Sequence, residues 1–270
     1  ELANVHTAER FGLDVPEDAY ERLAQAIQDE TQWAEVREHD WFRTAQSMAT
    51  EESFFHWELE FPEVFFAGDG AKKGDAGFDV VVGNPPYVPT EQIPASHKEY
   101  LTDQYETLYR KYDLSVAFLE RCFELTRKQG FTGMITPVAW ETGENYTEFR
   151  KKRLASADAR LTLIINLPYD VFADAYVDTN ISIFQIEGEF SGNFKAKELE
   201  KRLKITDVGG LRGDFEFIPC KYLRDEPNSK IYFTEGYYEL LQSYDSDEFK
   251  KLGKLTDSQQ GVVASFFEYS

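Results

Sequence analysis

The feature that most constrains this chain is a short apolar run that ends in a rigid turn. Residues Phe78–Gly83 read FDVVVG, and Asn84–Tyr87 follow at once as NPPY. A β-branched run bounded by turn residues is typical of a parallel strand that is buried on both faces. Ligands of open α/β sheets bind at the carboxyl ends of such strands. The run therefore predicts an α/β sheet with a ligand site at Asn84–Tyr87.

The turn offers the groups that can hold a flat ring with an amino substituent. The side-chain oxygen of Asn84 and the backbone carbonyl of Pro85 are two acceptors, and the proline rings keep the turn rigid. Two acceptors on one NH₂ group favour a tetrahedral nitrogen whose lone pair can attack, and Tyr87 can stack on the ring. We expect methyl transfer that is accelerated by positioning and electrostatics. A rigid loop without chemistry is the alternative, and the strand directly before the turn argues against it.

Farther along the chain, helical and strand-like segments alternate. A helix is expected over residues 113–128, because Asp113 suits a helix start and Gly130 follows its end. A basic helix is expected over residues 148–157, and strands are expected over residues 131–137, 161–167 and 180–186. This alternation favours a sheet that is mostly parallel.

The charge of the chain limits how it could contact nucleic acid. There are 49 acidic and 29 basic residues, which gives a net charge of −20. Phosphate contacts need Lys and Arg, so this balance argues against nucleic-acid binding. A basic surface could lie in one local cleft or in other parts of a longer polypeptide. Alternatively, the acidic surface is an adaptation to the salty cytoplasm of a halophile.

Several classes of protein find no support in the sequence. Cys122 and Cys220 are far apart and indicate neither a disulfide framework nor a metal site. No stretch approaches the ~20 apolar residues of a membrane span, and no leader opens the chain. We therefore expect a cytoplasmic protein without a metal and without a membrane partner. None of the histidines has metal-like or triad-like spacing; they are His6, His39, His56 and His97.

The ordered set of segments resembles a known family. Residues 78–87 resemble motif IV of amino-methyltransferases, and residues 54–65 resemble the lead-in of type IIG restriction–modification enzymes and of BREX-type phage-resistance methyltransferases. Residues 111–120 and 131–140 are similar to motifs V and VI. The last strands are matched by residues 161–172 and 177–183. The resemblance covers about half of the chain, roughly residues 54–190.

This resemblance implies a fold and a set of site residues. The fold would be an incomplete, Rossmann-like sheet of an S-adenosylmethionine-dependent methyltransferase, acting on the amino group of adenine in double-stranded DNA. Asn84 and Pro85 would bind the target amino group, Tyr87 would stack on the base, and Pro86 would line the same pocket. The remaining assignments are Phe118 against the adenine of S-adenosylmethionine and Phe172 on the second face of the flipped base.

The same reading sets expectations for the parts of the chain. Core packing is the alternative for Phe118 and Phe172, and Asp113 is expected only to start its helix. Residues 1–50 look helical, since Leu23, Ala26, Ile27 and Glu30 recur at helical spacing after Pro16. The expected organisation is a helical insertion, a catalytic half of the methyltransferase domain, a connecting β/α extension and the start of a β-rich recognition domain. Their ranges are 1–53, 54–190, 191–250 and 251–270.

The sequence departs from the family pattern in one respect. No glycine-rich S-adenosylmethionine turn and no acidic residue for the cofactor ribose are found before Asn84, and Gly68–Gly74 is no substitute. The chain starts with Glu1 rather than Met, so we expect a piece of a longer polypeptide. No nuclease-type cluster is evident. Partner proteins from a restriction or phage-defence system are expected.

Two other classes of function stay open. The NPPY motif also fits an RNA-base or protein-glutamine amino-methyltransferase, because these substrates also present an NH₂ group. A DNA-binding module without catalysis is a further alternative. The residues that continue beyond the last expected strand favour DNA.

Overall fold

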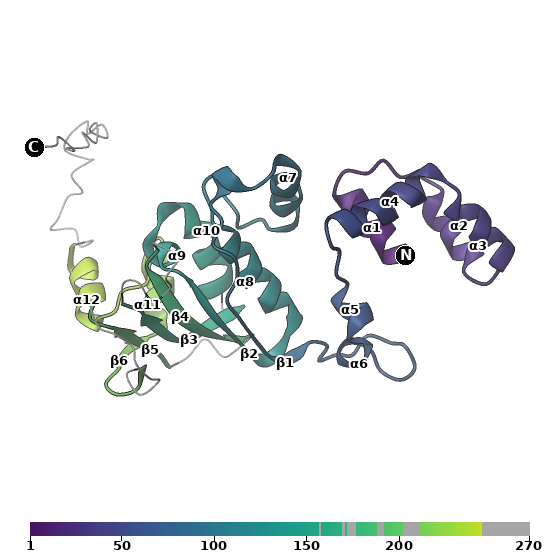
Figure 1. The fold of residues 1–270 in the computed structure, drawn as a ribbon. Helices are drawn as coiled ribbons and strands as arrows, with labels where there is room; N and C mark the ends of the chain where they lie inside the picture. The colour runs from purple at the N-terminus through teal and green to yellow at the C-terminus, as the bar shows by residue number, and fades with distance from the viewer. Residues whose placement is uncertain (157, 169–170, 172–176, 188–191, 202–210, 245–270) are drawn as a thin grey trace, which may run out of the picture.

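The structure is a computed structural model, and it describes residues 1–156, 158–168, 171, 177–187, 192–201 and 211–244. An N-terminal helical unit leads into an α/β unit built on one sheet (Figure 1). The sheet has the strand order β1-β2-β4-β3-β5-β6. The strands are β1 (Phe78–Gly83), β2 (Thr126–Pro137), β3 (Ala159–Asn166), β4 (Thr179–Ile186), β5 (Asn193–Glu198) and β6 (Glu216–Pro219).

The sheet is mixed, so the expectation of a mostly parallel sheet is wrong. β1 is parallel to β2 and β3 is parallel to β5, whereas the other three neighbouring pairs are antiparallel. Parallel neighbours need a long crossover, but β3 and β4 are consecutive antiparallel neighbours that do not need one. Because β4 is antiparallel to both β2 and β3, the strands β1, β2 and β3 run in the same direction. Their carboxyl ends therefore meet at one edge of the sheet.

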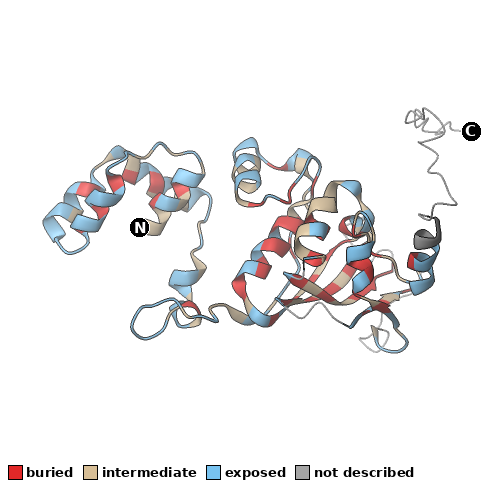
Figure 2. Cartoon of the chain, turned by 180° about the vertical axis from the view of Figure 1, so that it is seen from behind, coloured by how far each residue is buried: buried red, intermediate tan, exposed pale blue. Residues whose placement is uncertain are grey.

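The main core lies between the sheet and a layer of helices (Figures 1 and 2). α8 (Leu114–Leu125) crosses this face, and Phe184 of β4 is fully buried against the rings of Phe123 and Trp140, at centroid distances of 5.1 and 5.9 Å. α8 is shorter than expected because Thr126 already belongs to β2. The other short helices of this region are η1 (Thr90–Gln92), α7 (Ala95–Gln104), α9 (Ala139–Thr142), η2 (Glu144–Tyr146), α10 (Thr147–Phe149) and the π-helical η3 (Arg150–Leu154).

β1 is not buried on both faces, contrary to the expectation from its sequence. Val80 and Val82 are 57% and 75% exposed, while Val81 packs against the core. Two facts explain this. In the part of the chain that the structure describes, β1 has a single neighbour, β2, and α8 covers only the face to which Val81 points. The strand itself and its parallel pairing are confirmed.

The N-terminal unit is helical, as expected. Leu23 and Ala26 are buried in its separate small core, but Ile27, expected on the same stripe, is 59% exposed. This unit contacts α7 through the ring of Phe11, which stacks on Tyr100 at 4.3 Å. Its helices are α1 (Leu2–Arg10), α2 (Ala19–Ala26), α3 (Glu30–Arg37), α4 (Asp40–Glu51), α5 (Trp57–Glu60) and α6 (Pro62–Phe65).

The sheet and its core continue past residue 190, where the expected catalytic half ends. β5 and β6 extend the sheet beyond β3, and Ile218, Leu223 and Tyr238 join the main core. α11 (Lys221–Asp225) and α12 (Glu235–Tyr244) complete the described C-terminal part. The proposed domain ranges stay a prediction, and residues 251–270 lie outside the described residues.

A core substitution tests this packing. Phe184→Ala should lower the free energy of unfolding by about 3–5 kcal/mol, because it leaves a cavity between the sheet and α8. Phe217→Ala is the matched control, since Phe217 lies on β6 with 56% exposure; it should cost less than about 1 kcal/mol. Urea unfolding followed by circular dichroism measures both. Equal losses in the two variants would contradict the packing.

Candidate functional site

The Asn84–Tyr87 turn lies where β1 ends, at the edge where the carboxyl ends of β1, β2 and β3 meet. Pro85 is buried, and Asn84 and Pro86 are exposed. The Tyr87 hydroxyl lies 2.7 Å from Asn84 Oδ1 and 3.1 Å from the Ile135 carbonyl oxygen near the end of β2. A hydroxyl has one proton to donate, so these two acceptors share it. The structure thus brings Asn84, Pro85 and Tyr87 together and fastens them to β2.

The charge state of Tyr87 suits a hydroxyl that donates a hydrogen bond. Burial raises the pKa of Tyr87 to about 12, and the negative charge of Asp113 adds to the shift. A phenol with this pKa stays protonated at neutral pH and remains a donor. The oxygen of the Asn84 amide has two lone pairs, so it can accept a further hydrogen bond beside the one from Tyr87.

The chain after the turn is fastened to the start of α8. Asp113 caps this helix, since its carboxylate accepts a hydrogen bond from the Ser115 amide at 2.9 Å. The Leu114 amide donates to the Val88 carbonyl at 2.9 Å, directly after the turn. The expectation that Asp113 starts its helix is confirmed. Its carboxylate also supports the turn indirectly, because capping holds Leu114 in place.

Phe118 lies on α8 next to an apolar pocket of about 400 Å³. Its side chain is 42% exposed, so it is not an ordinary core residue. Val88 and Leu114 contribute to the same wall, which places the pocket beside the Asn84–Tyr87 turn. The remaining lining comes from Phe11, Gln92, Ile93, Pro94, His97, Tyr100 and Leu101. The role of Phe118 stays a prediction. Phe172 lies outside the described residues.

The sequence analysis did not find Glu141, a buried acid at the same edge. Its side chain is 5% exposed, and its two carboxylate oxygens accept hydrogen bonds from Asn180 at 2.7 Å and from Asn166 at 3.2 Å. Burial raises the pKa of Glu141 to about 7, although the two amides act in the opposite direction. The only local signal was an acid directly after Trp140, the last residue of the segment similar to motif VI.

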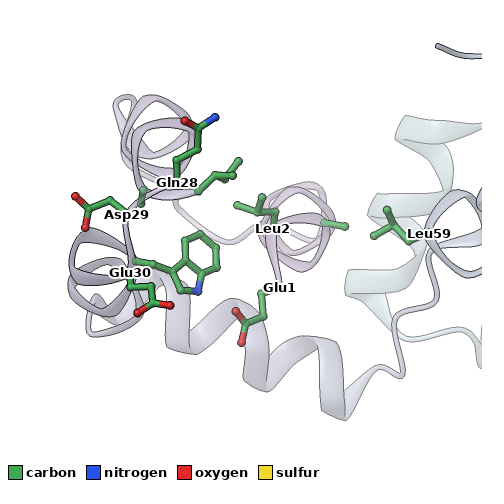
Figure 3. Close-up of a pocket in the computed structure, with 10 residues that line it drawn as sticks. Glu1, Leu2, Gln28, Asp29, Glu30 and Leu59 are labelled. Carbon is green, nitrogen blue, oxygen red and sulfur yellow. The ribbon is translucent and has the colours of Figure 1, made fainter. Parts of the chain in front are cut away.

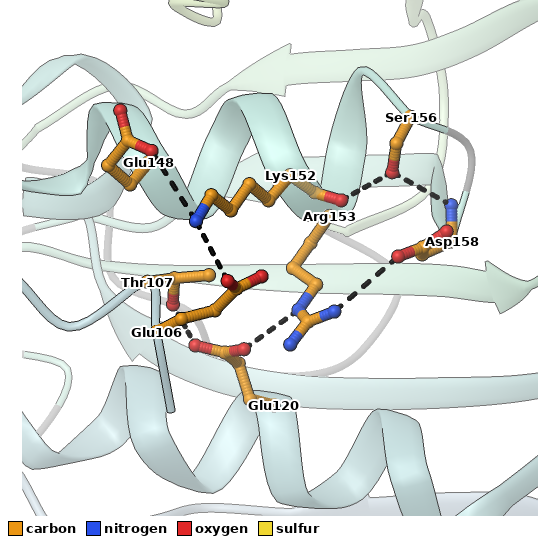
Figure 4. A network of polar contacts seen from close by, with 8 residues as sticks. All are labelled: Glu106, Thr107, Glu120, Glu148, Lys152, Arg153, Ser156 and Asp158. Carbon is orange, nitrogen blue, oxygen red and sulfur yellow. Dashed lines mark hydrogen bonds and ion pairs between the residues drawn. The ribbon is translucent and has the colours of Figure 1, made fainter. Parts of the chain in front are cut away.

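Three of the four cations at residues 150–153 already have partners in the structure, and Figure 4 shows two of them, Lys152 and Arg153. Arg153 pairs with Glu120, which is 1% exposed, at 2.8 Å, and Lys152 lies 3.0 Å from Glu106. Arg150 is fully buried and donates to backbone carbonyls. Arg153 thus links η3 to α8, Lys152 pairs with an acid that precedes α8, and Arg150 holds backbone carbonyls, so these three cations already have partners.

A larger pocket lies away from the Asn84–Tyr87 turn, in the N-terminal helical unit (Figure 3). Its volume is about 660 Å³, and its acidic lining residues are Glu1, Asp29 and Glu30. Asp29 caps α3, and Glu1 pairs with Arg37. Asp29 and Glu1 thus have structural roles, and the lining of the pocket has no arrangement that indicates catalysis.

Two further properties hold for the described part of the chain. No group of three or more His, Cys, Asp or Glu side chains is placed there to bind a metal ion. Among the helices that the structure describes, none combines the length and the apolar character that crossing a lipid bilayer requires.

Comparison with known proteins places the chain in a family. Residues 9–172 match the family model described as Eco57I restriction-modification methylase. This match spans more than half of the 270 residues, so the chain belongs to this family. The resemblance to restriction–modification methyltransferases that the motifs indicated is therefore confirmed.

The relatives are much longer than this chain. A protein of Methanocaldococcus jannaschii, provisionally named a type II restriction enzyme and methyltransferase, is 26% identical over 224 residues, which are 80% of this chain and 17% of the relative. The type II restriction enzyme and methyltransferase RM.Eco57I of Escherichia coli is 35% identical over 135 residues, or 48% of this chain and 13% of that protein. The chain thus spans less than a fifth of either relative.

Solved structures of two restriction-modification proteins align with parts of this chain at low identity. A type I restriction-modification methyltransferase subunit from Streptococcus thermophilus aligns with 64% of this chain and 32% of its own, at 17% identity and a TM-score of 0.39. The type IIG restriction endonuclease BpuSI aligns with 44% of this chain and 14% of its own, at 21% identity and a TM-score of 0.36. The expected α/β class is confirmed, with a mixed sheet of six strands.

Substitutions of Asp113 test how the turn is fastened. Asp113→Ala removes the cap of α8 and should cost about 1 kcal/mol of unfolding free energy. Asp113→Asn keeps an oxygen that can cap and should cost only a few tenths of that. Urea unfolding of both variants is the measurement. An equal loss for Asn and Ala would show that the charge, and not the cap, matters.

Proposed function

We propose that the protein to which this chain belongs methylates the exocyclic amino group of adenine in double-stranded DNA. The observation that carries the proposal is the Asn84–Tyr87 turn at the shared strand edge, with the Tyr87 hydroxyl between Asn84 and Ile135. Membership of the restriction-modification methylase family supports DNA as the substrate. The protein would work in the cytoplasm, beside the partners of a restriction or phage-defence system.

Asn84, Pro85 and Tyr87 would act by holding the target nitrogen. Asn84 Oδ1 and the Pro85 carbonyl would each accept one of the two amino protons. If the Asn84 amide turns, its NH₂ group can donate to the Tyr87 oxygen, and its own oxygen is then free for the substrate. The Tyr87 hydroxyl would then accept from the Asn84 NH₂ group and donate its own proton to the Ile135 carbonyl. Its ring, beside Pro86, would support one face of the base.

S-adenosylmethionine would supply an electrophilic methyl group. The apolar pocket lined by Val88, Leu114 and Phe118 fits a flat ring such as the adenine of this cofactor. This chain has no glycine-rich turn before Asn84 to hold the methionine part. That part would be held by segments of the longer protein.

The DNA would be bound largely by other parts of the protein. The chain carries a net charge of −20, and Lys152 and Arg153 are already paired with acids. Phosphate contacts depend on free Lys and Arg side chains. We therefore assign recognition of the target base to this chain, and binding of the DNA phosphates to the rest of the protein.

The direct test replaces Asn84 in the full-length protein. Asn84→Ala should lower methyl transfer by about 10²–10³-fold, by analogy with the loss of one preorganised polar contact to a reacting group. DNA binding should change little, since Asn84 acts in the chemical step. Transfer of a labelled methyl group from S-adenosylmethionine to plasmid DNA measures the rate, and a mobility shift measures binding.

Asn193→Ala is the matched control, because Asn193 is exposed at the start of β5, on a different strand from Asn84. It should methylate at the wild-type rate. Near-normal methyl transfer by Asn84→Ala would contradict the role assigned to Asn84. Label that enters RNA or protein but not DNA would favour another amino-methyltransferase.

A second test concerns Phe172, which should stack on the base opposite Tyr87. A base must leave the helical stack before its amino group can be reached, and stacking on aromatic rings is worth about 1–3 kcal/mol per base. With 2-aminopurine at the target position, Phe172→Ala should give brighter emission in the complex and slower methylation. Unchanged emission and rate would mean that Phe172 is not part of the pocket.

A further inference from the structure

The carboxylate of Glu141 joins the ends of three strands. Glu141 lies on α9, directly after β2, and it accepts hydrogen bonds from the last residue of β3, Asn166, and from the second residue of β4, Asn180. These two asparagines are register partners, and the Leu167 amide donates to the Thr179 carbonyl at 2.9 Å beside them. One buried acid therefore holds the end of β3 and the start of β4 together, where the β3–β4 connection leaves the sheet.

The same contacts reach the candidate site. Asn180 Oδ1 accepts a hydrogen bond from the Thr136 hydroxyl at 3.1 Å. Thr136 follows Ile135, whose carbonyl accepts the hydrogen bond of Tyr87 at 3.1 Å. The Thr136 hydroxyl in turn accepts the indole N–H of Trp140 at 2.9 Å. A continuous path of hydrogen bonds and one peptide unit thus leads from Glu141 to Tyr87.

The proton of Glu141 decides which hydrogen bonds this network can form. An ionised carboxylate accepts both amides, whereas the acid form replaces one acceptor by a donor. In the described structure, the side-chain oxygen of Asn166 is buried and has no hydrogen-bond partner. Protonated Glu141 could donate to this oxygen if the Asn166 amide turns. Each protonation state of Glu141 therefore favours a different arrangement of the Asn166 and Asn180 side chains.

We propose that Glu141 is a positioning residue for the methyl transfer: it holds the end of β2 so that the Ile135 carbonyl keeps Tyr87 and Asn84 in place. The inference rests on the function proposed above. Glu141 touches neither the base nor the methyl group, and it acts only through Asn180 and Thr136.

The surroundings of Glu141 determine at which pH it changes state. Glu198 at the end of β5 raises the pKa of Glu141, and Lys201 lowers it. Lys201 lies 3.7 Å from both Glu198 and Asp178. On the other side, Arg150 donates to the Trp140 carbonyl at 2.8 Å. The Ile231 amide donates to the Glu141 backbone carbonyl. Its neighbour Lys230 pairs with Glu144 at 2.7 Å.

The test is the pH profile of kcat in the full-length enzyme, with plasmid DNA that lacks adenine methylation and saturating S-adenosylmethionine. In the wild type, kcat should fall as the pH decreases through an inflection near the pKa of Glu141, about 7. Glu141→Gln should lower kcat about tenfold, leave KM within about twofold and lose the inflection. A Glu141 with a merely structural role would change the melting temperature and leave the inflection in place.

Two surface variants keep the inference testable if Glu141→Gln does not fold. Glu198→Gln should move the inflection to lower pH, and Lys201→Met should move it to higher pH, because each removes one charge that acts on Glu141. An inflection that none of the three variants moves would overturn the inference, provided that the wild type methylates DNA. A wild type that transfers no methyl group would instead overturn the proposed function, and the inference with it.

Discussion

The hydrogen bonds of the Tyr87 hydroxyl are the interaction on which the candidate site depends. One end of this contact is Asn84, on the turn after β1, and the other is the Ile135 carbonyl, near the end of β2. This contact ties the turn directly to β2, in addition to the ladder between β1 and β2. The raised pKa of Tyr87, about 12, keeps the hydroxyl a donor at any pH at which the protein works. The turn that would hold an amino group is therefore anchored to β2 before a substrate arrives, and such anchoring is the condition for catalysis by positioning.

The direction of the strands makes this contact possible. β1, β2 and β3 run the same way because β4 is antiparallel to both of its neighbours. Their carboxyl ends form one polar edge, where Asn84, Tyr87 and Glu141 gather. The helix layer buries an apolar face of the sheet and does not cover the ends of these strands. β1, with Val80 and Val82 exposed, remains accessible along one side.

The sequence was sufficient for the elements whose signals are local. The FDVVVG run, the NPPY turn and the cap of α8 at Asp113 all lie where the residues predict, because β-branched residues, prolines and capping acids act on their immediate neighbours. Burial of β1 and the direction of β4 were not predictable in this way, since they depend on which strands become neighbours. Glu141 was missed for the same reason: its partners Asn166 and Asn180 lie 25 and 39 residues away in the chain. The roles of Phe118 and Phe172 rest on the family resemblance and stay predictions.

The most direct measurement is the identity of the methylated nucleoside. The full-length protein would be incubated with unmethylated double-stranded DNA and S-adenosylmethionine carrying an isotope-labelled methyl group, and the DNA would then be digested and its nucleosides separated by mass spectrometry. Our account predicts the label on the exocyclic nitrogen of adenine. Label on cytosine, or DNA that stays unlabelled while the protein binds it, would contradict the account.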